Sequence, residues 1–298
     1  HCVVTEENMW MTAPTVPGYS LTAKRWGRLS VSNISEVMFR EDAIDVLVLD
    51  EEKKALIMAL VEHSDDKLRF RDVIEGKGGG TIFLLHGNPG TGKTLTAEAV
   101  AEALHRPLYS IGVGELGTSV EHLEDKLTEI LELAAGWRSV LLLDEADIFL
   151  EARGDDIERN AMVGVFLRLL ERHNGVLMLT TNRVRRFDKA FHSRISLAIR
   201  YPDMDLSTRV QVWTNLLRAA RIDHIDPRAL ADLGDLNGRE IKNLIPMAVV
   251  SAKREGVRVE VRHIELCLKL RSSSCRTSTR QTSAATSRKS RRAGRARR

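Results

Sequence analysis

The sequence has few cysteines and no long apolar run, and both absences restrict the kind of protein it encodes. Cys2, Cys267 and Cys275 are odd in number and lack a Cys-x-x-Cys spacing, which argues against a zinc site or a disulfide framework. No apolar run approaches the roughly 18 residues that a membrane span needs. We therefore expect a soluble intracellular protein, cytoplasmic or nuclear. The sequence begins at His1 rather than at methionine, which leaves room for an upstream targeting or anchoring segment.

Acidic residues are missing from one end of the chain. Residues 271–298 hold ten Lys or Arg and no acid, so the net charge of +4 conceals a mildly acidic body with 35 basic and 41 acidic residues. A uniformly basic nucleic-acid binder is thereby excluded, and attraction to polyanions would lie mainly in this tail. The tail lacks aromatic residues for stacking on bases, so we interpret it as a solvated, disordered extension, with nuclear import or polyanion binding as the alternative.

The first 75 residues carry no functional motif and are interpreted as an N-terminal extension of unknown role. A strand is predicted at 26–31 and a helix from Asp50, which can cap it, with Glu51 and Glu52 at its positive end. Glycines at 76 and 78–80 then predict a boundary.

Residues 76–203 alternate short apolar runs with helical segments, which predicts an α/β fold: a mostly parallel sheet with helices on both faces. The runs expected to form strands are 81–86, 108–111, 139–143, 176–180 and 197–200. Residues 119–135 have apolar side chains at helical spacing, as a helix that covers the sheet would. Residues 204–270 read as four helices, 206–221, 228–233, 238–255 and 263–270, which predict a small helical domain.

A phosphate-binding loop follows the first of these predicted strands. It matches Gly-x-x-x-x-Gly-Lys-[Ser/Thr] and opens a helix, and its residues are Gly87, Asn88, Pro89, Gly90, Thr91, Gly92, Lys93 and Thr94. In such a loop backbone N–H groups surround phosphate oxygens, the lysine reaches the outer phosphates and the hydroxyl of Thr94 contacts Mg²⁺. The sequence therefore predicts an ATP and Mg²⁺ site.

Two carboxylates stand at the end of another apolar strand. Asp144 and Glu145 follow residues 139–143, and the ends of parallel strands are where open α/β sheets place ligand chemistry. We expect Asp144 to support Mg²⁺ and Glu145 to orient and polarise the water that attacks the γ-phosphate.

These motifs, together with the segments 180–183 and 187–195, resemble the AAA+ ATPases over roughly residues 81–270. The chain looks most similar to fungal AAA-domain proteins of undefined role, and more distantly to the AAA domains of mitochondrial assembly chaperones. The resemblance implies a nucleotide-binding α/β domain with a helical lid, ATP at a subunit interface and a homo-oligomer, usually a hexameric ring that remodels a protein or complex.

The resemblance also implies roles for three further residues. Asn182 matches sensor 1, which lies between the γ-phosphate and the attacking water. Arg194 matches the arginine finger that completes a neighbouring subunit's site, with Arg183, Arg185 and Arg186 as rivals. Arg239 resembles the sensor 2 arginine that reports the nucleotide state to the lid.

The sequence departs from the family at one point and leaves two other functions open. Residues 112–118 contain no aromatic side chain, so threading by an aromatic pore loop is not implied. The first alternative is a nucleotide-gated scaffold with little turnover. The second is an RNA-dependent ATPase, suggested by the letters Asp-Glu-Ala-Asp at 144–147, although the chain has room for only one α/β domain.

Overall fold

The computed structural model describes residues 13–62, 80–150, 156–183 and 189–271. Their contacts divide the chain into two compact units. The first contains the residues up to Gly87 and residues 92–201, and the second contains residues 88–91 and those from Pro202 onward. The glycines at 76, 78 and 79, the candidate fingers Arg185 and Arg186, and residues 272–298 of the basic tail lie outside the described residues. The domain boundaries drawn from the sequence stay predictions.

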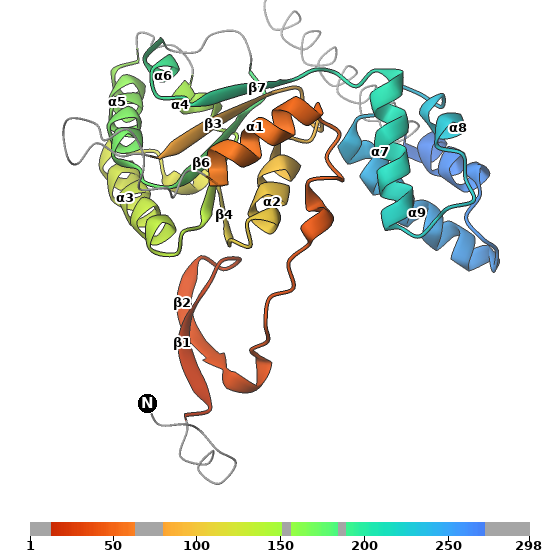
Figure 1. Cartoon of the computed structure of the whole chain (residues 1–298), viewed down its shortest axis with the longest axis horizontal. Helices are drawn as coiled ribbons and strands as arrows, with labels where there is room; N and C mark the ends of the chain where they lie inside the picture. Colours follow the sequence, from red (N-terminus) through yellow and green to blue (C-terminus); the bar gives the residue numbers. More distant parts are fainter. Residues whose placement is uncertain (1–12, 63–79, 151–155, 184–188, 272–298) are drawn as a thin grey trace, which may run out of the picture. The chain divides into compact units, whose positions relative to one another are not determined.

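The first unit is built on a five-stranded parallel sheet (Figure 1). Its strands are β3 (Thr81–Gly87), β4 (Leu108–Gly112), β5 (Val140–Asp144), β6 (Val176–Thr181) and β7 (Leu197–Tyr201). They pair in the order β4-β5-β6-β3-β7, so β3, which leads into the phosphate loop, is an interior strand. The predicted α/β class, with a parallel sheet and a helical C-terminal region, is confirmed.

Helices cover both faces of this sheet because the strand side chains alternate between two cores. Ile82 and Leu84 face α3 (Val120–Gly136) and α5 (Ile157–Arg172), whereas Phe83 and Leu85 face α1 (Glu51–Glu62) and α2 (Lys93–Ala103) (Figure 1). Residues i and i+2 of a strand share one face, so nearly continuous apolar strands are buried on both sides. Two short helices, α4 (Asp147–Leu150) and α6 (Lys189–His192), follow β5 and β6 near the site.

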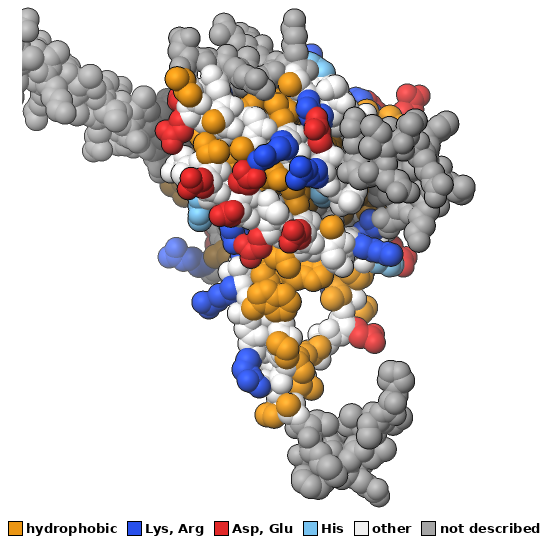
Figure 2. Space-filling model, turned by 90° about the vertical axis from the view of Figure 1, so that its left-hand side faces the viewer, with side chains coloured by type: hydrophobic (Ala, Val, Ile, Leu, Met, Phe, Trp, Pro, Cys, Tyr) orange, Lys and Arg blue, Asp and Glu red, His pale blue; other side chains and the backbone are white. Residues whose placement is uncertain are grey.

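A β-hairpin near the N-terminus belongs to the same unit. Its strands are β1 (Thr15–Ser20) and β2 (Arg25–Ser30), which pair antiparallel. Tyr19 packs against Trp137 at a ring-centroid distance of 4.9 Å, and its hydroxyl lies 2.7 Å from that of Tyr109 on β4. Figure 2 shows hydrophobic side chains gathered on the hairpin, where Trp26 remains 61% exposed. The sequence predicted β2 but missed β1, since the proline and glycine in β1 weaken the strand pattern.

The segment after β4 is not a free loop. Residues 113–116 form a 3₁₀ helix (η5, Val113–Leu116), and Val113 and Leu116 are buried. Glu115 forms an ion pair with Lys24 of the hairpin and accepts a hydrogen bond from the backbone N–H of Gly112. This segment, which lacks aromatic residues, is therefore tied to the body of its own unit.

The second unit is helical. It contains α7 (Leu206–Ala219), α8 (Pro227–Ala231), α9 (Gly238–Glu255) and a helix over residues 261–271, packed around the fully buried Trp213. Asp205, Asp226 and Asn237 accept a hydrogen bond from the first turn of α7, α8 and α9 respectively, which satisfies one backbone donor at each helix start. In the described part of the chain, no helix is both long and apolar enough to span a bilayer.

His173 predicts a pH dependence of stability for the first unit. It follows α5, is 3% exposed, and burial lowers its pKa from 6.5 to about 4. The unfolded chain therefore binds this proton more readily than the folded one, and stability present above pH 6.5 is lost as the pH falls toward 4. Between pH 7 and pH 5 this corresponds to about 2 kcal/mol.

We measure the free energy of unfolding in urea at pH 7 and at pH 5. Between these pH values, His173→Gln should lose about 2 kcal/mol less of this free energy than the wild type. His122→Gln, at an exposed histidine in the first turn of α3, serves as the control. Equal acid sensitivity in the wild type and His173→Gln would show that His173 is not the group responsible.

Candidate active site

The phosphate loop connects β3 to α2 through backbone conformations that favour glycine. Gly87 ends β3 with φ at +153°, and a Cβ there would lie 2.3 Å from the carbonyl oxygen of Tyr201 on β7. Gly92 lies at the N-terminus of α2 in the left-handed region, with φ at +104° and open space where a Cβ would be. A side chain at either position would strain the backbone, so the loop geometry depends on glycine.

Lys93 and Thr94 begin α2 from this loop. Lys93 is 7% exposed, and its Nζ donates a hydrogen bond of 2.8 Å to the carbonyl oxygen of Gly87, so the ammonium group lies against the loop itself. The hydroxyl of Thr94 lies 3.4 and 3.5 Å from the two carboxylate oxygens of Asp144. The structure thus brings together Thr94 and Asp144, the two residues that the sequence assigned to Mg²⁺.

Asp144 and Glu145 stand where β5 ends. Asp144 is the last residue of the strand and is half-buried, whereas Glu145 is exposed. Glu145 has φ at +58°, in the left-handed region that a residue with a Cβ rarely adopts, at a cost of about 1 kcal/mol. Its backbone N–H donates a hydrogen bond of 3.0 Å to the hydroxyl of Thr180 on β6.

Asn182 directly follows β6 and is held by Asp147, the first residue of α4. The carboxylate of Asp147 accepts hydrogen bonds from the backbone N–H of Asn182, at 3.2 Å, and from the hydroxyl of Thr181. In the sequence, Asp147 was noted only as the last residue of the Asp-Glu-Ala-Asp segment at 144–147. Its role as an anchor for Asn182 depends on two adjacent parallel strands ending side by side.

Arg194 lies between α6 and β7. Its guanidinium donates to the carbonyl oxygen of Ala190 and forms an ion pair with Glu171 on α5, and its side chain is 23% exposed. Within its own chain Arg194 is therefore anchored beside α5. The rival Arg183 follows Asn182 and is exposed.

The remaining predicted residues belong to the second unit. The carbonyl oxygen of Gly90 accepts a hydrogen bond of 3.0 Å from the N–H of Gly238, and the side-chain amide of Asn88 donates to Asp203. Thr91 donates 2.8 Å to the carbonyl oxygen of Asn88 within the loop. Arg239 is exposed in the first turn of α9.

Tyr201 supports the loop but carried no recognisable signal in the sequence. Its backbone is paired with Gly87, and its hydroxyl lies 2.6 Å from that of Thr96 on α2, in the interior. Burial raises the pKa of the Tyr201 hydroxyl to about 12, so the group stays protonated.

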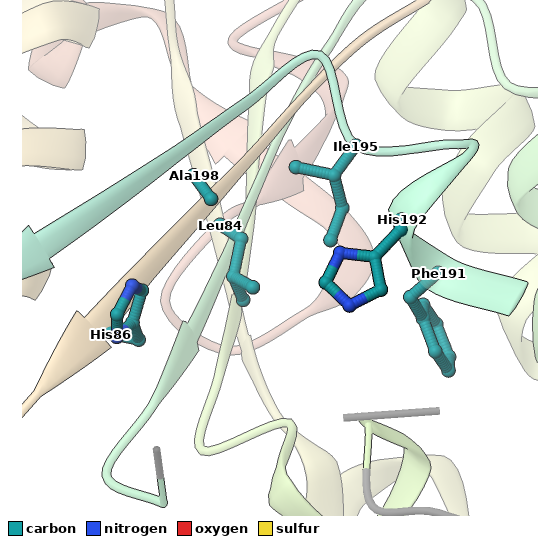
Figure 3. Close-up of a pocket in the computed structure, with 6 residues that line it drawn as sticks. All are labelled: Leu84, His86, Phe191, His192, Ile195 and Ala198. Carbon is teal, nitrogen blue, oxygen red and sulfur yellow. The ribbon is translucent and has the colours of Figure 1, made fainter. Parts of the chain in front are cut away.

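A separate cavity of about 430 Å³ lies beside β3 and β7 (Figure 3). It is lined by Leu84, His86, Phe191, His192, Ile195 and Ala198. Burial lowers the pKa of His86, and the positive charges of Arg200 and Lys93 lower it further, so the imidazole is neutral near pH 7. None of the predicted site residues lines this cavity.

The residues present fit a magnesium nucleotide. Mg²⁺ prefers oxygen ligands and is usually held by one or two carboxylates together with substrate phosphates and water. The hydroxyl of Thr94 and the carboxylate of Asp144 supply such oxygens next to a loop with glycines at its conformationally demanding positions. Lys93 supplies the positive charge.

Together, the parallel sheet, the glycine-dependent loop between β3 and α2 and the acidic end of β5 define a P-loop nucleotide-binding protein. Residues 83–203 also match the family described as "ATPase family associated with various cellular activities (AAA)". This part of the chain is therefore an AAA domain, of the kind that AAA+ ATPases carry.

Curated relatives support the same family. The chain is 28% identical to a putative 26S proteasome regulatory subunit homolog of Methanothermobacter thermautotrophicus, over 76% of this chain and 63% of that protein. It is 29% identical to the katanin p60 ATPase-containing subunit A1 of Strongylocentrotus purpuratus, over 61% of this chain and 39% of that protein. A mitochondrial sorting homolog of Caenorhabditis elegans is 30% identical over 59% of this chain and 54% of that protein. The chain thus spans less than two thirds of the length of these relatives.

Proposed function

We propose that this protein hydrolyses ATP to ADP and phosphate and uses the turnover to remodel a protein or a protein complex. The observation that carries the proposal is the meeting of Thr94, at the start of α2, with Asp144, at the end of β5, 3.4 Å apart. A P-loop that only bound nucleotide would not need the exposed carboxylate of Glu145 directly after Asp144, nor an Asn182 anchored by Asp147 at the end of β6.

The proposed roles follow from chemistry and position. Lys93 binds the outer phosphate oxygens and the N–H groups of the loop surround them. Thr94 and Asp144 hold Mg²⁺, which neutralises charge on the phosphates when bound. Glu145 accepts the proton of the attacking water, and Asn182 orients that water. The γ-phosphoryl group leaves ADP and is transferred to the water oxygen.

The proposed assembly is a homo-oligomeric ring, as is common among AAA proteins, in which Arg194 of one copy reaches the nucleotide of the next. A guanidinium there neutralises charge that builds on the phosphoryl group, so assembly and hydrolysis would be coupled. The relatives include proteins named for a proteasome regulatory subunit and for a katanin subunit. We propose a polypeptide assembly as the substrate class of this protein.

The test is steady-state ATP hydrolysis per protomer over a wide range of protein concentration, with Mg²⁺ in excess. We expect specific activity to rise with concentration and then level off, because each site needs a second copy. Phosphate release and sedimentation are measured on the same samples. The protein concentration at which specific activity is half-maximal should equal the concentration at which half of the protein is assembled.

Other outcomes would favour other functions. Tight ATP binding without turnover at any concentration would contradict hydrolysis and indicate a nucleotide-gated scaffold. Turnover that appears only with added RNA would contradict the remodelling proposal in favour of an RNA-dependent ATPase. Specific activity independent of concentration, with a monomer in sedimentation, would exclude the shared site.

A further inference from the structure

The backbone pairing between β5 and β6 stops just before the catalytic residues. The last paired residues are Leu143 and Leu179, and the next residue on β6 is Thr180, which is 1% exposed. At this point the side chain of Thr180 takes over one contact of the ladder. Its hydroxyl accepts a hydrogen bond from the N–H of Glu145, at 3.0 Å, and donates one to Oδ1 of Asp144.

The carbonyl group of Thr180 holds the following residue as well. The N–H of Ala146 donates a hydrogen bond of 2.9 Å to this oxygen. Two consecutive amides, those of Glu145 and Ala146, are therefore bound by one residue of the neighbouring strand. This double contact counteracts the unfavourable left-handed conformation of Glu145, whose φ is +58°.

The hydroxyl group is well suited to these two neighbours. It has a single proton, which goes to the carboxylate of Asp144, and lone pairs, one of which accepts from the amide of Glu145. The bond from Thr180 also orients the carboxylate of Asp144 relative to the hydroxyl of Thr94. No apolar side chain could make either contact.

We propose that Thr180 is a positioning residue for ATP hydrolysis: its hydroxyl sets the direction of Glu145 and the orientation of Asp144. This inference rests on the proposed hydrolytic function and adds to it a role for Thr180, a residue of the segment 180–183 to which the sequence assigned no function. Thr180 acts through its neighbours, and its effect falls on the hydrolytic step rather than on the capture of nucleotide by the phosphate loop.

Thr180→Val is the decisive variant, since valine keeps the branched shape and removes the hydroxyl. We expect kcat to fall about 100-fold, because misplacement of a catalytic group by about 1 Å can have an effect of that size. The KM for ATP and the affinity for a fluorescent ATP analogue should stay within about threefold of the wild type, because loop contacts dominate binding. Thr180→Ser keeps the hydroxyl and should retain activity within about threefold of the wild type.

The controls separate positioning from loss of structure. Thr214→Val removes a threonine hydroxyl that bonds to Val210 within α7, and it should leave kcat unchanged. Thermal unfolding and binding of the analogue check that Thr180→Val is folded. If it fails those checks, Thr180→Ala takes its place under the same criteria, with Thr180→Ser again as the rescue.

The outcomes also separate this inference from the function on which it rests. Wild-type activity that is abolished in Glu145→Gln but retained within threefold in a folded Thr180→Val would overturn the role of Thr180 and leave the proposed function intact. Equal losses in Thr180→Ser and Thr180→Val would likewise overturn it, since the hydroxyl would not be the group that matters. A wild type without any hydrolysis would overturn both proposals.

Discussion

Replacing Glu145 by glutamine is expected to leave ATP bound and to reduce its hydrolysis by about two to four orders of magnitude. Glutamine has nearly the same shape but cannot accept the proton of the attacking water, and general-base catalysis is worth about 10² to 10⁴ in rate. Glu145 is exposed at the end of β5, next to Asp144, so the change leaves the core intact. The measurement is phosphate release at saturating MgATP, beside a titration with a fluorescent ATP analogue.

Lys93→Ala provides the complementary variant. The ammonium group of Lys93 lies against the loop, 2.8 Å from the carbonyl oxygen of Gly87, and its removal deletes the charge that binds the outer phosphates. We expect this variant to lose binding of the analogue, whereas Glu145→Gln keeps it. If Glu145→Gln turned over ATP at the wild-type rate, the assignment of the base would be wrong.

Removing the guanidinium of Arg194 is expected to have the second large effect. If Arg194 completes the site of a neighbouring copy, Arg194→Ala should bind ATP normally and lose about 10³-fold or more in kcat. In its own chain Arg194 pairs with Glu171 and with the carbonyl oxygen of Ala190, beside α5. Arg218→Ala, at an exposed position of α7, is the control and should keep full activity.

A mixing experiment tests whether Arg194 acts between copies. Lys93→Ala lacks a working phosphate loop but carries Arg194, and Arg194→Ala has the opposite defect. Each is inactive alone, and an equimolar mixture should recover part of the activity if the finger acts on a neighbouring site. A fully active Arg194→Ala would instead direct attention to Arg183 or to one of the arginines at 185 and 186.

Much of this fold was predictable because its signals are local. The phosphate loop needs glycine at Gly87 and Gly92 and a lysine before the helix, and all of these are neighbours in the sequence. The five strands were predicted because they are short apolar runs, and the three interior strands, β3, β5 and β6, are buried on both faces. Strand β1 and helix α5 were not predicted. For β1 the reason is that its Tyr19 packs against Tyr109 and Trp137, about a hundred residues further along the chain, and such contacts leave no local pattern.

In the candidate site, too, some residues could be predicted from local sequence and others depend on contacts between distant segments. Asp144 and Glu145 could be selected from the sequence because they stand at the end of an apolar run, and Asn182 because its segment resembles that of the AAA+ ATPases. Thr180 could not, because its hydroxyl matters only where the end of β6 lies beside the end of β5. The contact of Asp147 with Asn182 and that of Tyr201 with Gly87 likewise exist only because the strands that these residues end or follow are neighbours in the folded sheet.

By itself the sequence determined the class of this protein: a phosphate loop, an acidic strand end and alternating apolar segments already indicate a P-loop nucleotide-binding chain, and its motifs resemble those of the AAA+ ATPases. Tertiary structure alone decided how the catalytic groups are held. The hydroxyl of Thr180 donates a hydrogen bond to Asp144 and accepts one from the N–H of Glu145, which links strands more than thirty residues apart in the chain. Local propensity and periodicity describe what a segment can form, whereas the partner of a buried hydroxyl depends on which strands become neighbours in the folded sheet.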